Sequence, residues 1–438
     1  MMKRTRSLGL ITTSALSLLF AGFGSYACSS SGNPAPAGSS GSSGSSGGVD
    51  ASNDNDVVSG QDGGDGAKAD AASALPLGTI PTVDEPDVPC VTTNGVKTVL
   101  FAPPGGTGAP PVSRVQALGA RRFATGLDTN GFVTFDAAGT TPKLFTISLG
   151  TSETAFPSEG TTIGAMALSS GKLDYQRYDD QGVASGGLVS VATGISAGTN
   201  HVWVASGGGG SLAVWASDTT LFAAGITAAG ALAGPPFTLA TSAPNAKVAI
   251  TYSGDKYAIA YSYDAAGGGG AAARFVYASA TALVGAPVDI GTANALEPVA
   301  ITPTSAGFVM VVDAGGDEHI YVVPLDTTGK LSGPAHRLLG GDLPWGLASH
   351  AGDAALVSLT NDVKVGTAEG PRAPQLRPLD ITGKPTGPWV CLDQKIPAGL
   401  NQDMGILAEA SGGYAVVYKA PDDGSTLIRT DKLGTGAP

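Results

Sequence analysis

The sequence is poor in the residues that most often build catalytic and metal sites. Its 438 residues include 3 cysteines, 4 histidines and 4 tryptophans, and charged residues make up 14% of the chain. No two of the histidines are spaced as in the common zinc motifs; they are His201, His319, His336 and His350. The 24 basic residues are outnumbered by 36 acidic ones, so the basic stripe that binds nucleic acid is missing. We therefore expect no nucleic-acid partner, no metal and no other cofactor.

Two short matches to catalytic motifs carry little weight. Residues 194–198 fit the G-x-S-x-G nucleophile pattern, but they lie between expected strands and not at a strand-to-helix elbow. Gly267, Gly269 and Ala272 imitate a dinucleotide fingerprint, yet they lead into an expected strand where that fingerprint needs a helix N-terminus. In a chain with 65 glycines such matches arise by chance. We assign no catalytic residue, and whether the protein is an enzyme stays open.

The first 27 residues have the layout of a secretory signal peptide. Lys3, Arg4 and Arg6 precede an apolar run at 8–23, and small residues lead up to Cys28. The basic residues are not a consecutive arginine pair, which favours the general export route. An uncleaved membrane anchor is the alternative, but the run is short for a bilayer, which needs about 20 apolar residues.

Cys28 is preceded by Ala27 and followed by Ser29, Ser30 and Ser31. This N-terminus resembles that of a bacterial lipoprotein precursor, and the resemblance implies acylation of Cys28 and anchoring in the cell envelope, at the outer membrane or facing the periplasm. More than one acyl chain makes such anchoring stable. Ser25 stands where the family usually has leucine, so cleavage by ordinary signal peptidase and free secretion remain the alternative. The resemblance does not tell which membrane leaflet holds the protein.

Residues 28–75 are expected to form a flexible tether. They consist mainly of Gly, Ser, Ala, Asp and Pro and contain no aromatic residue, so they cannot bury enough apolar surface to fold. Their aspartates do not follow the spacing of a calcium-binding loop. The tether would hold the following domain, 76–438, away from the membrane.

The two remaining cysteines, Cys90 and Cys391, lie near the two ends of this domain. In an oxidising compartment such a pair favours a disulfide over a metal site. We expect this bond to link the beginning of the domain to its end.

The domain contains a repeat with a period of about 50 residues. A frame of the type Leu-Asp-x-Thr-Gly, followed four residues later by a second glycine, occurs at 325–329 and 379–383, with weaker copies at 226–230, 178–182 and 277–281 and a truncated one ending at Gly434. Aspartate at the first position of a type I turn and glycine at its fourth position are typical of a β-hairpin. Each frame therefore predicts a hairpin corner.

Short runs rich in Val, Ile, Tyr and Phe flank each corner and give four strands per repeat, and no segment has a sustained helical period. Four-stranded units in series predict an all-β fold, a β-propeller with seven blades favoured and six as the alternative. Candidate second strands of the seven blades start near Phe132, Leu173, Leu212, Tyr257, Phe308, Leu356 and Tyr414. Residues 95–101 could supply the outer strand that the last repeat lacks. An open β-solenoid or a pair of β-sandwiches is the structural alternative.

An aspartate follows the expected second strand in nearly every unit. These aspartates are Asp136, Asp218, Asp264, Asp313, Asp362 and Asp422. In a propeller such connections emerge on one face, where carboxylates could attract a cation or a basic partner. The simpler interpretation is that aspartate starts a turn well. The tryptophans, Trp203, Trp215, Trp345 and Trp389, are too few for a carbohydrate platform and suit core packing.

We expect a monomeric, membrane-anchored protein whose propeller binds a protein or glycan or acts as a scaffold. A propeller-type hydrolase or lyase is the alternative, and a tight acid-base cluster on the face carrying Asp264 and Asp313 would favour it. A featureless face would favour a purely structural spacer.

Overall fold

The chain divides into two units, Met1–Ala67 and Lys68–Pro438. The computed structural model describes residues between Ile80 and Thr430, with gaps of which the longest are 102–113, 361–373 and 393–403. The expected signal peptide, Cys28 and the tether at 28–75 lie outside the described residues. Every described element is a β-strand. No helix in the described part of the chain could span a membrane.

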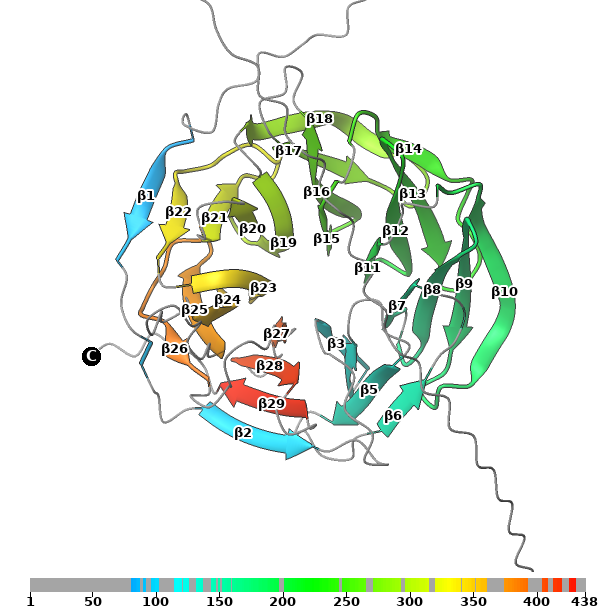
Figure 1. Ribbon diagram of the computed structural model, residues 1–438, viewed down its shortest axis with the longest axis horizontal. Helices are drawn as coiled ribbons and strands as arrows, with labels where there is room; N and C mark the ends of the chain where they lie inside the picture. Colours follow the sequence, from blue (N-terminus) through cyan, green and yellow to red (C-terminus); the bar gives the residue numbers. More distant parts are fainter. Residues whose placement is uncertain are drawn as a thin grey trace, which may run out of the picture. The chain divides into compact units, whose positions relative to one another are not determined.

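The strands form seven sheets. In each sheet, four antiparallel strands follow one another from the inside of the ring to its outside (Figure 1). Their strands, from the inner one outward, are β3 (Arg114–Leu118), β4 (Arg121–Thr125), β5 (Gly131–Asp136) and β6 (Lys143–Thr146) in blade 1; β7 (Ser152–Pro157), β8 (Ile163–Ser169), β9 (Lys172–Tyr178) and β10 (Ala184–Thr193) in blade 2; β11 (Val202–Gly207), β12 (Gly210–Ser217), β13 (Thr220–Thr227) and β14 (Phe237–Ala240) in blade 3; and β15 (Val248–Ser253), β16 (Lys256–Asp264), β17 (Ala271–Ala278) and β18 (Leu283–Thr292) in blade 4.

The remaining three blades follow the same order. They contain β19 (Leu296–Thr304), β20 (Gly307–Ala314), β21 (Ile320–Leu325) and β22 (Ala335–Leu338) in blade 5; β23 (Gly341–Ser349), β24 (Asp353–Thr360), β25 (Pro374–Asp380) and β26 (Val390–Cys391) in blade 6; and β27 (Met404–Ala408), β28 (Tyr414–Lys419), β29 (Ser425–Thr430) and β2 (Val96–Phe101) in blade 7. β1 (Thr82–Glu85) adds a fifth strand to blade 5.

The inner strands close into a ring. Each contacts the inner strand of the next blade, and β27 of blade 7 contacts β3 of blade 1. The all-β propeller expected from the repeat is therefore confirmed, and the open solenoid and the paired sandwiches are not what the chain forms.

The apolar core lies between neighbouring blades. One cluster joins Val309 and Val322 of blade 5 to Leu356 and Trp389 of blade 6, and equivalent clusters join the other described neighbours. A single twisted sheet could not cover both of its apolar faces, so each blade depends on the next for burial. This dependence explains why the units occur only in series.

The hairpin frame occupies the same corner in each regular blade, between the third and fourth strands. Gly329 donates its backbone N–H to the carbonyl oxygen of Asp326 (3.0 Å), and Gly383 does the same to Asp380 (3.0 Å). The aspartate carboxylate then accepts the backbone N–H groups two and four residues later, as at Thr382 (2.8 Å) and Lys384 (3.0 Å). The corner glycines have φ between 76° and 83°, which fits the left-handed conformation that favours glycine; they are Gly182, Gly230, Gly329 and Gly383.

The first two blades were only partly predicted. Phe132 and Leu173 lie in β5 and β9, which are third strands and not second strands. The true second strand of blade 1, β4, begins with Arg121 and Arg122 and so lacks the apolar run that marks the other second strands. The candidate second strands of the other five blades, from Leu212 to Tyr414, are in β12, β16, β20, β24 and β28 as expected.

The segment from Ile80 to Phe101 is here called the strap, and its described parts lie along the outside of blades 5, 6 and 7 (Figure 1). β1 pairs in parallel with β22, Val91 bridges to Val390 of β26, and β2 pairs with β29 as the outer strand of blade 7. The predicted closing strand at 95–101 is thus present. The Cys90–Cys391 disulfide ties the strap to blade 6.

Candidate binding face

The two ends of the ring differ in their connections. One end carries the turns between first and second strands and between third and fourth strands. The other end, here called the variable face, carries the second-to-third connections and the links between blades. These second-to-third connections range from two residues, at 170–171 and 218–219, to the stretch 361–373. Differences in loop length on a uniform scaffold are typical of a binding surface.

The predicted aspartates do not all reach this face. Asp218 follows β12, and Asp264 and Asp313 lie in the last two positions of the second strands β16 and β20, so all three belong to the variable face. Asp136 ends β5, a third strand, and therefore lies at the opposite end of the ring. Asp362 and Asp422 are outside the described residues. In the described stretches, no group of three or more His, Cys, Asp or Glu side chains could hold a metal ion.

Asp218 is held in a defined conformation by its neighbours. Its φ of 53° is left-handed, a region that aspartate tolerates better than most residues. Its backbone N–H donates to the hydroxyl of Ser196 (3.0 Å), and the side chain itself is exposed. A fixed backbone beneath an exposed carboxylate suits recognition of a partner.

Ser196, the central residue of the G-x-S-x-G match, links blades 2 and 3. Besides accepting from Asp218, it donates its backbone N–H to the hydroxyl of Ser217 (3.1 Å). The residue lies on the connection from β10 to β11, between two strands, as the sequence suggested. The corresponding link from blade 3 to blade 4 is tied down by Lys247, whose N–H donates to the Ser262 hydroxyl (2.8 Å). These links give the variable face a rigid base across blades 2 to 4.

A cluster of Arg274, Tyr263 and Asp289 sits on the outer half of blade 4. The guanidinium of Arg274 stacks on the ring of Tyr263, with Cζ 3.9 Å from the ring centroid, and its Nε donates to Asp289 Oδ1 (2.6 Å). The hydroxyl of Tyr263 donates to the same oxygen (2.9 Å). Burial, and then the hydrogen bond to Asp289, raise the pKa of Tyr263 to about 12. About a third of the Arg274 side chain is exposed. The sequence gives no sign of this cluster because its members are spread over three strands.

The three described histidines lie in or beside different blades. His201 is exposed beside Trp203, with ring centroids 6.1 Å apart. His350 Nε2 lies 2.7 Å from the carbonyl oxygen of Gly413 and so links blades 6 and 7. His319, like Gly267 and Gly269, is outside the described residues. Trp215 and Trp389 are fully buried, as expected of core residues.

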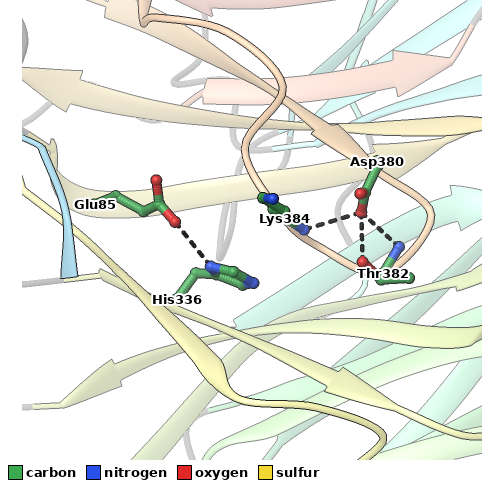
Figure 2. A network of polar contacts seen from close by, with 5 residues as sticks. All are labelled: Glu85, His336, Asp380, Thr382 and Lys384. Atoms are coloured by element: carbon green, nitrogen blue, oxygen red, sulfur yellow. Dashed lines mark hydrogen bonds and ion pairs between the residues drawn. The ribbon is translucent and has the colours of Figure 1, made fainter. Parts of the chain in front are cut away.

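His336 and Glu85 join the strap to blade 5. Glu85 Oε1 lies 2.9 Å from His336 Nδ1, and on the other side of the same strands Asp84 Oδ2 accepts from Arg337 Nη2 (2.7 Å). Figure 2 shows the Glu85 carboxylate directed at the His336 ring, whereas the carboxylate of Asp380 faces its own turn. These contacts hold the strap in place, and the sequence of residues 80–91 carries no signal for them apart from Cys90.

Arg377 lies buried close to this junction, on the face of blade 6 that meets blade 5. Its side chain is 3% exposed, and Cζ lies 5.5 Å from the centroid of Trp389. Burial lowers the pKa of Arg377, and the carboxylate of Glu85 partly opposes that effect.

No model of a known protein family matches the chain, and no curated protein matches its sequence. Solved structures resemble its fold. AztD from Citrobacter koseri has a TM-score of 0.41 and 15% identity, over 74% of this chain and 86% of that one. The Dos1 propeller has a TM-score of 0.45 and 10% identity, over 74% and 79%. Kuenenia stuttgartiensis hydrazine synthase has a TM-score of 0.45 and 13% identity, over 78% and 97%. These likenesses concern the fold and carry no information on a ligand.

Proposed function

We propose that this protein is an exported binding module, anchored in the cell envelope through acylated Cys28, whose propeller recognises a protein or glycan at the variable face. The contrast between the two ends of the ring carries the proposal. At one end the turns join each blade to the next. Tyr277 donates its hydroxyl hydrogen to the carbonyl oxygen of Thr327 (2.7 Å), and Arg177 donates to the carbonyl oxygen of Ala228 (2.9 Å), in each case in the following blade. At the variable face the second-to-third connections differ more widely in length, from two residues to the stretch 361–373.

The disulfide supports export. A disulfide between Cys90 and Cys391 is favoured in an oxidising compartment, and bacterial cells provide one outside the cytoplasm. With these two cysteines paired, Cys28 is the one cysteine left in the sequence. Its position behind a signal-like segment supports acylation.

Recognition is better supported than hydrolysis or elimination. Near the variable face, the described group closest to an acid-base cluster is Tyr263, Arg274 and Asp289. Tyr263 there holds its proton until strongly alkaline pH, because burial and Asp289 raise its pKa to about 12. A tyrosine in this state is a poor general base near neutral pH. A stacked arginine with an exposed edge, by contrast, is a common contact in binding surfaces.

Anchoring can be tested on the full chain. In a bacterial host fed with labelled palmitate, we expect the wild-type chain to carry the label and to sediment with membranes. Cys28→Ser should lose the label and appear in the soluble envelope fraction. A wild-type chain that is exported, cleaved and unlabelled would overturn the lipid anchor and leave the binding role to be judged separately.

Binding can be tested with two matched variants. Thr219 is an exposed residue of the variable face, and Thr281 is an exposed residue of a turn at the opposite end. We expect Thr219→Arg to abolish retention of whatever envelope component the wild-type chain retains after cross-linking, and Thr281→Arg to leave it unchanged. Both variants should melt like the wild type. Loss of retention in Thr281→Arg alone would place the binding surface at the wrong end of the ring.

A further inference from the structure

One position of the repeat lies at the outer edge of each regular blade, and the residue found there differs between blades. It lies two residues after the second glycine of the hairpin frame, at the start of the fourth strand in blades 3, 5 and 6 and within that strand in blades 2 and 4. In blades 2 to 6 the residues at this position are Leu188, Pro236, Pro287, Ala335 and Trp389. Their different surroundings show how each edge is protected from pairing with another chain.

The edges of blades 5 and 6 are covered by the strap. Ala335 donates its backbone N–H outward to the carbonyl oxygen of Pro81 (2.7 Å), and the carbonyl oxygen of Trp389 accepts from Val91 (2.8 Å). Blade 7 has β2 as its own outer strand. Adding a strand from outside is therefore a form of pairing that this ring already uses.

Prolines lie at the edges of blades 3 and 4, where Pro236 directly precedes β14 and Pro287 lies within β18. Pro236 and Pro287 have no backbone N–H to offer, and proline is a common means of blocking an exposed strand edge. In blade 4 the fourth strand also carries the charged residue Asp289. The outer strand of blade 1, β6, is four residues long and begins with Lys143.

Blade 2 lacks all of these protections. β10 is ten residues long, contains neither proline nor a charged residue, and no described strand pairs with its outer edge. Leu188 is the blade 2 residue at the position two residues after the second glycine, and it is 59% exposed. Val183 at the preceding corner is 60% exposed. Blades 5 and 6 have a lysine, Lys330 and Lys384, where blade 2 has Val183.

We propose that β10 is a self-association edge, on which β10 of a second copy of this chain adds as an antiparallel strand about a twofold axis. The absence of charged residues on β10 allows a second copy to approach there. The chain has a net charge of −12, and like charges placed opposite each other across strands are destabilising. Because β10 is uncharged, two copies can meet there without such repulsion, and the exposed Leu188 of each copy gains apolar contact.

The association is weak. β10 leaves the register of β9 between Ser185 and Val189 and again between Ser190 and Ala192, and the carbonyl oxygens of Ser185 and Gly186 accept from the Gln176 side chain. The regular register with β9 is therefore limited to short stretches of β10, of which 189–190 and 192–193 follow Gly187. Such a short strand pair buries less than the roughly 1,000 Å² of a stable interface. A concentration-dependent dimer, and not the monomer suggested by the sequence, is the expected state at high local concentration.

Sedimentation of the exported full-length chain carrying Cys28→Ser tests this proposal without interference from lipid. Over protein concentrations from about 5 to 500 µM we expect the weight-average mass to rise from that of a monomer toward that of a dimer, a range that matches the micromolar or weaker affinity of small interfaces. Leu188→Pro, which installs the residue found in blades 3 and 4, should remain monomeric throughout.

Val284→Lys is the matched control, since Val284 is an exposed apolar residue on the proline-blocked edge of blade 4. It should dimerise like the parent chain, whereas Leu188→Lys should not. A parent chain that stays monomeric at the highest concentration overturns the proposal, and so does a dimer that survives Leu188→Pro. Neither outcome bears on ligand binding at the variable face.

Discussion

The ring of Phe275 fills the space in front of Gly329, the corner glycine of the next blade, so that a Cβ at Gly329 would overlap it. Gly329 has φ 83°, and Gly285 in blade 4 has the same φ of 83°, but a Cβ at Gly285 would meet nothing within 4 Å. Comparing Gly329 with Gly285 separates two costs of adding a side chain. One is the left-handed backbone, which both positions share, and the other is crowding, which only Gly329 has.

We expect Gly285→Ala to lower the free energy of unfolding by about 1–2 kcal/mol, the cost of a left-handed alanine. Gly329→Ala should lower it by a further 1–3 kcal/mol or so, because the added methyl group must displace Phe275. Urea unfolding of the two variants measures the difference. Equal losses would mean that the corner does not pack against the neighbouring blade.

Removing the disulfide should destabilise the ring. The bond closes a loop between residues 301 positions apart, and loss of a native disulfide typically costs about 2–5 kcal/mol. The double variant Cys90→Ser, Cys391→Ser should therefore unfold at lower urea concentration than the wild type. Adding a reductant should shift the wild type to the same midpoint and leave the variant unchanged, and a reductant-insensitive wild type would contradict the role of the bond.

Acid should weaken the corner at Asp326. The hydroxyl of Thr328 donates to this carboxylate (2.7 Å) and, with the backbone N–H groups of Lys330 and Thr328, holds the pKa of Asp326 below its ordinary value. A depressed pKa stabilises the fold above the ordinary pKa of about 3.9 and loses that contribution as the pH falls below it. The stability difference between wild type and Asp326→Ala should thus shrink between about pH 5 and pH 2. A constant difference over that range would show that ionisation of Asp326 does not matter.

Alkali should act on Tyr263. Its pKa of about 12 is above the ordinary value near 10, so its stabilising contribution is complete below about pH 10 and is lost as the pH rises toward 12. Tyr263→Phe loses the hydrogen bond to Asp289, and should be less stable than the wild type at neutral pH but lose less stability between pH 10 and 12. Chemical unfolding at both pH values measures this, and an identical alkaline loss in the two proteins would refute it.

The fold was predictable because the hairpin frame marks one corner in most blades. Asp326 with Gly329 and Asp380 with Gly383 each fix a turn by local hydrogen bonds, so the signal survives in sequence alone. Prediction failed where the local signal is weak. β4 begins with two arginines, and this displaced the strand assignment of blade 1 and put Asp136 at the wrong end of the ring.

The candidate site was less predictable because its contacts join distant segments. Arg274, Tyr263 and Asp289 come together only through the register of three strands. The pairing of β1 with β22 depends on an edge left open in blade 5, and nothing in residues 82–85 announces it. Cys90, through its expected partner Cys391, pointed only to the contact of the strap with blade 6.

The strap also sets an order of events during the proposed export. Its residues would cross the membrane first, but its partner strands β22, β26 and β29 are among the last to emerge, so the N-terminal segment must wait while most of the ring follows it. Contacts between such distant segments are slow to form. During such export the last blade could not be completed before β29 had been translocated, and Cys90 would stay unpaired until Cys391 arrived.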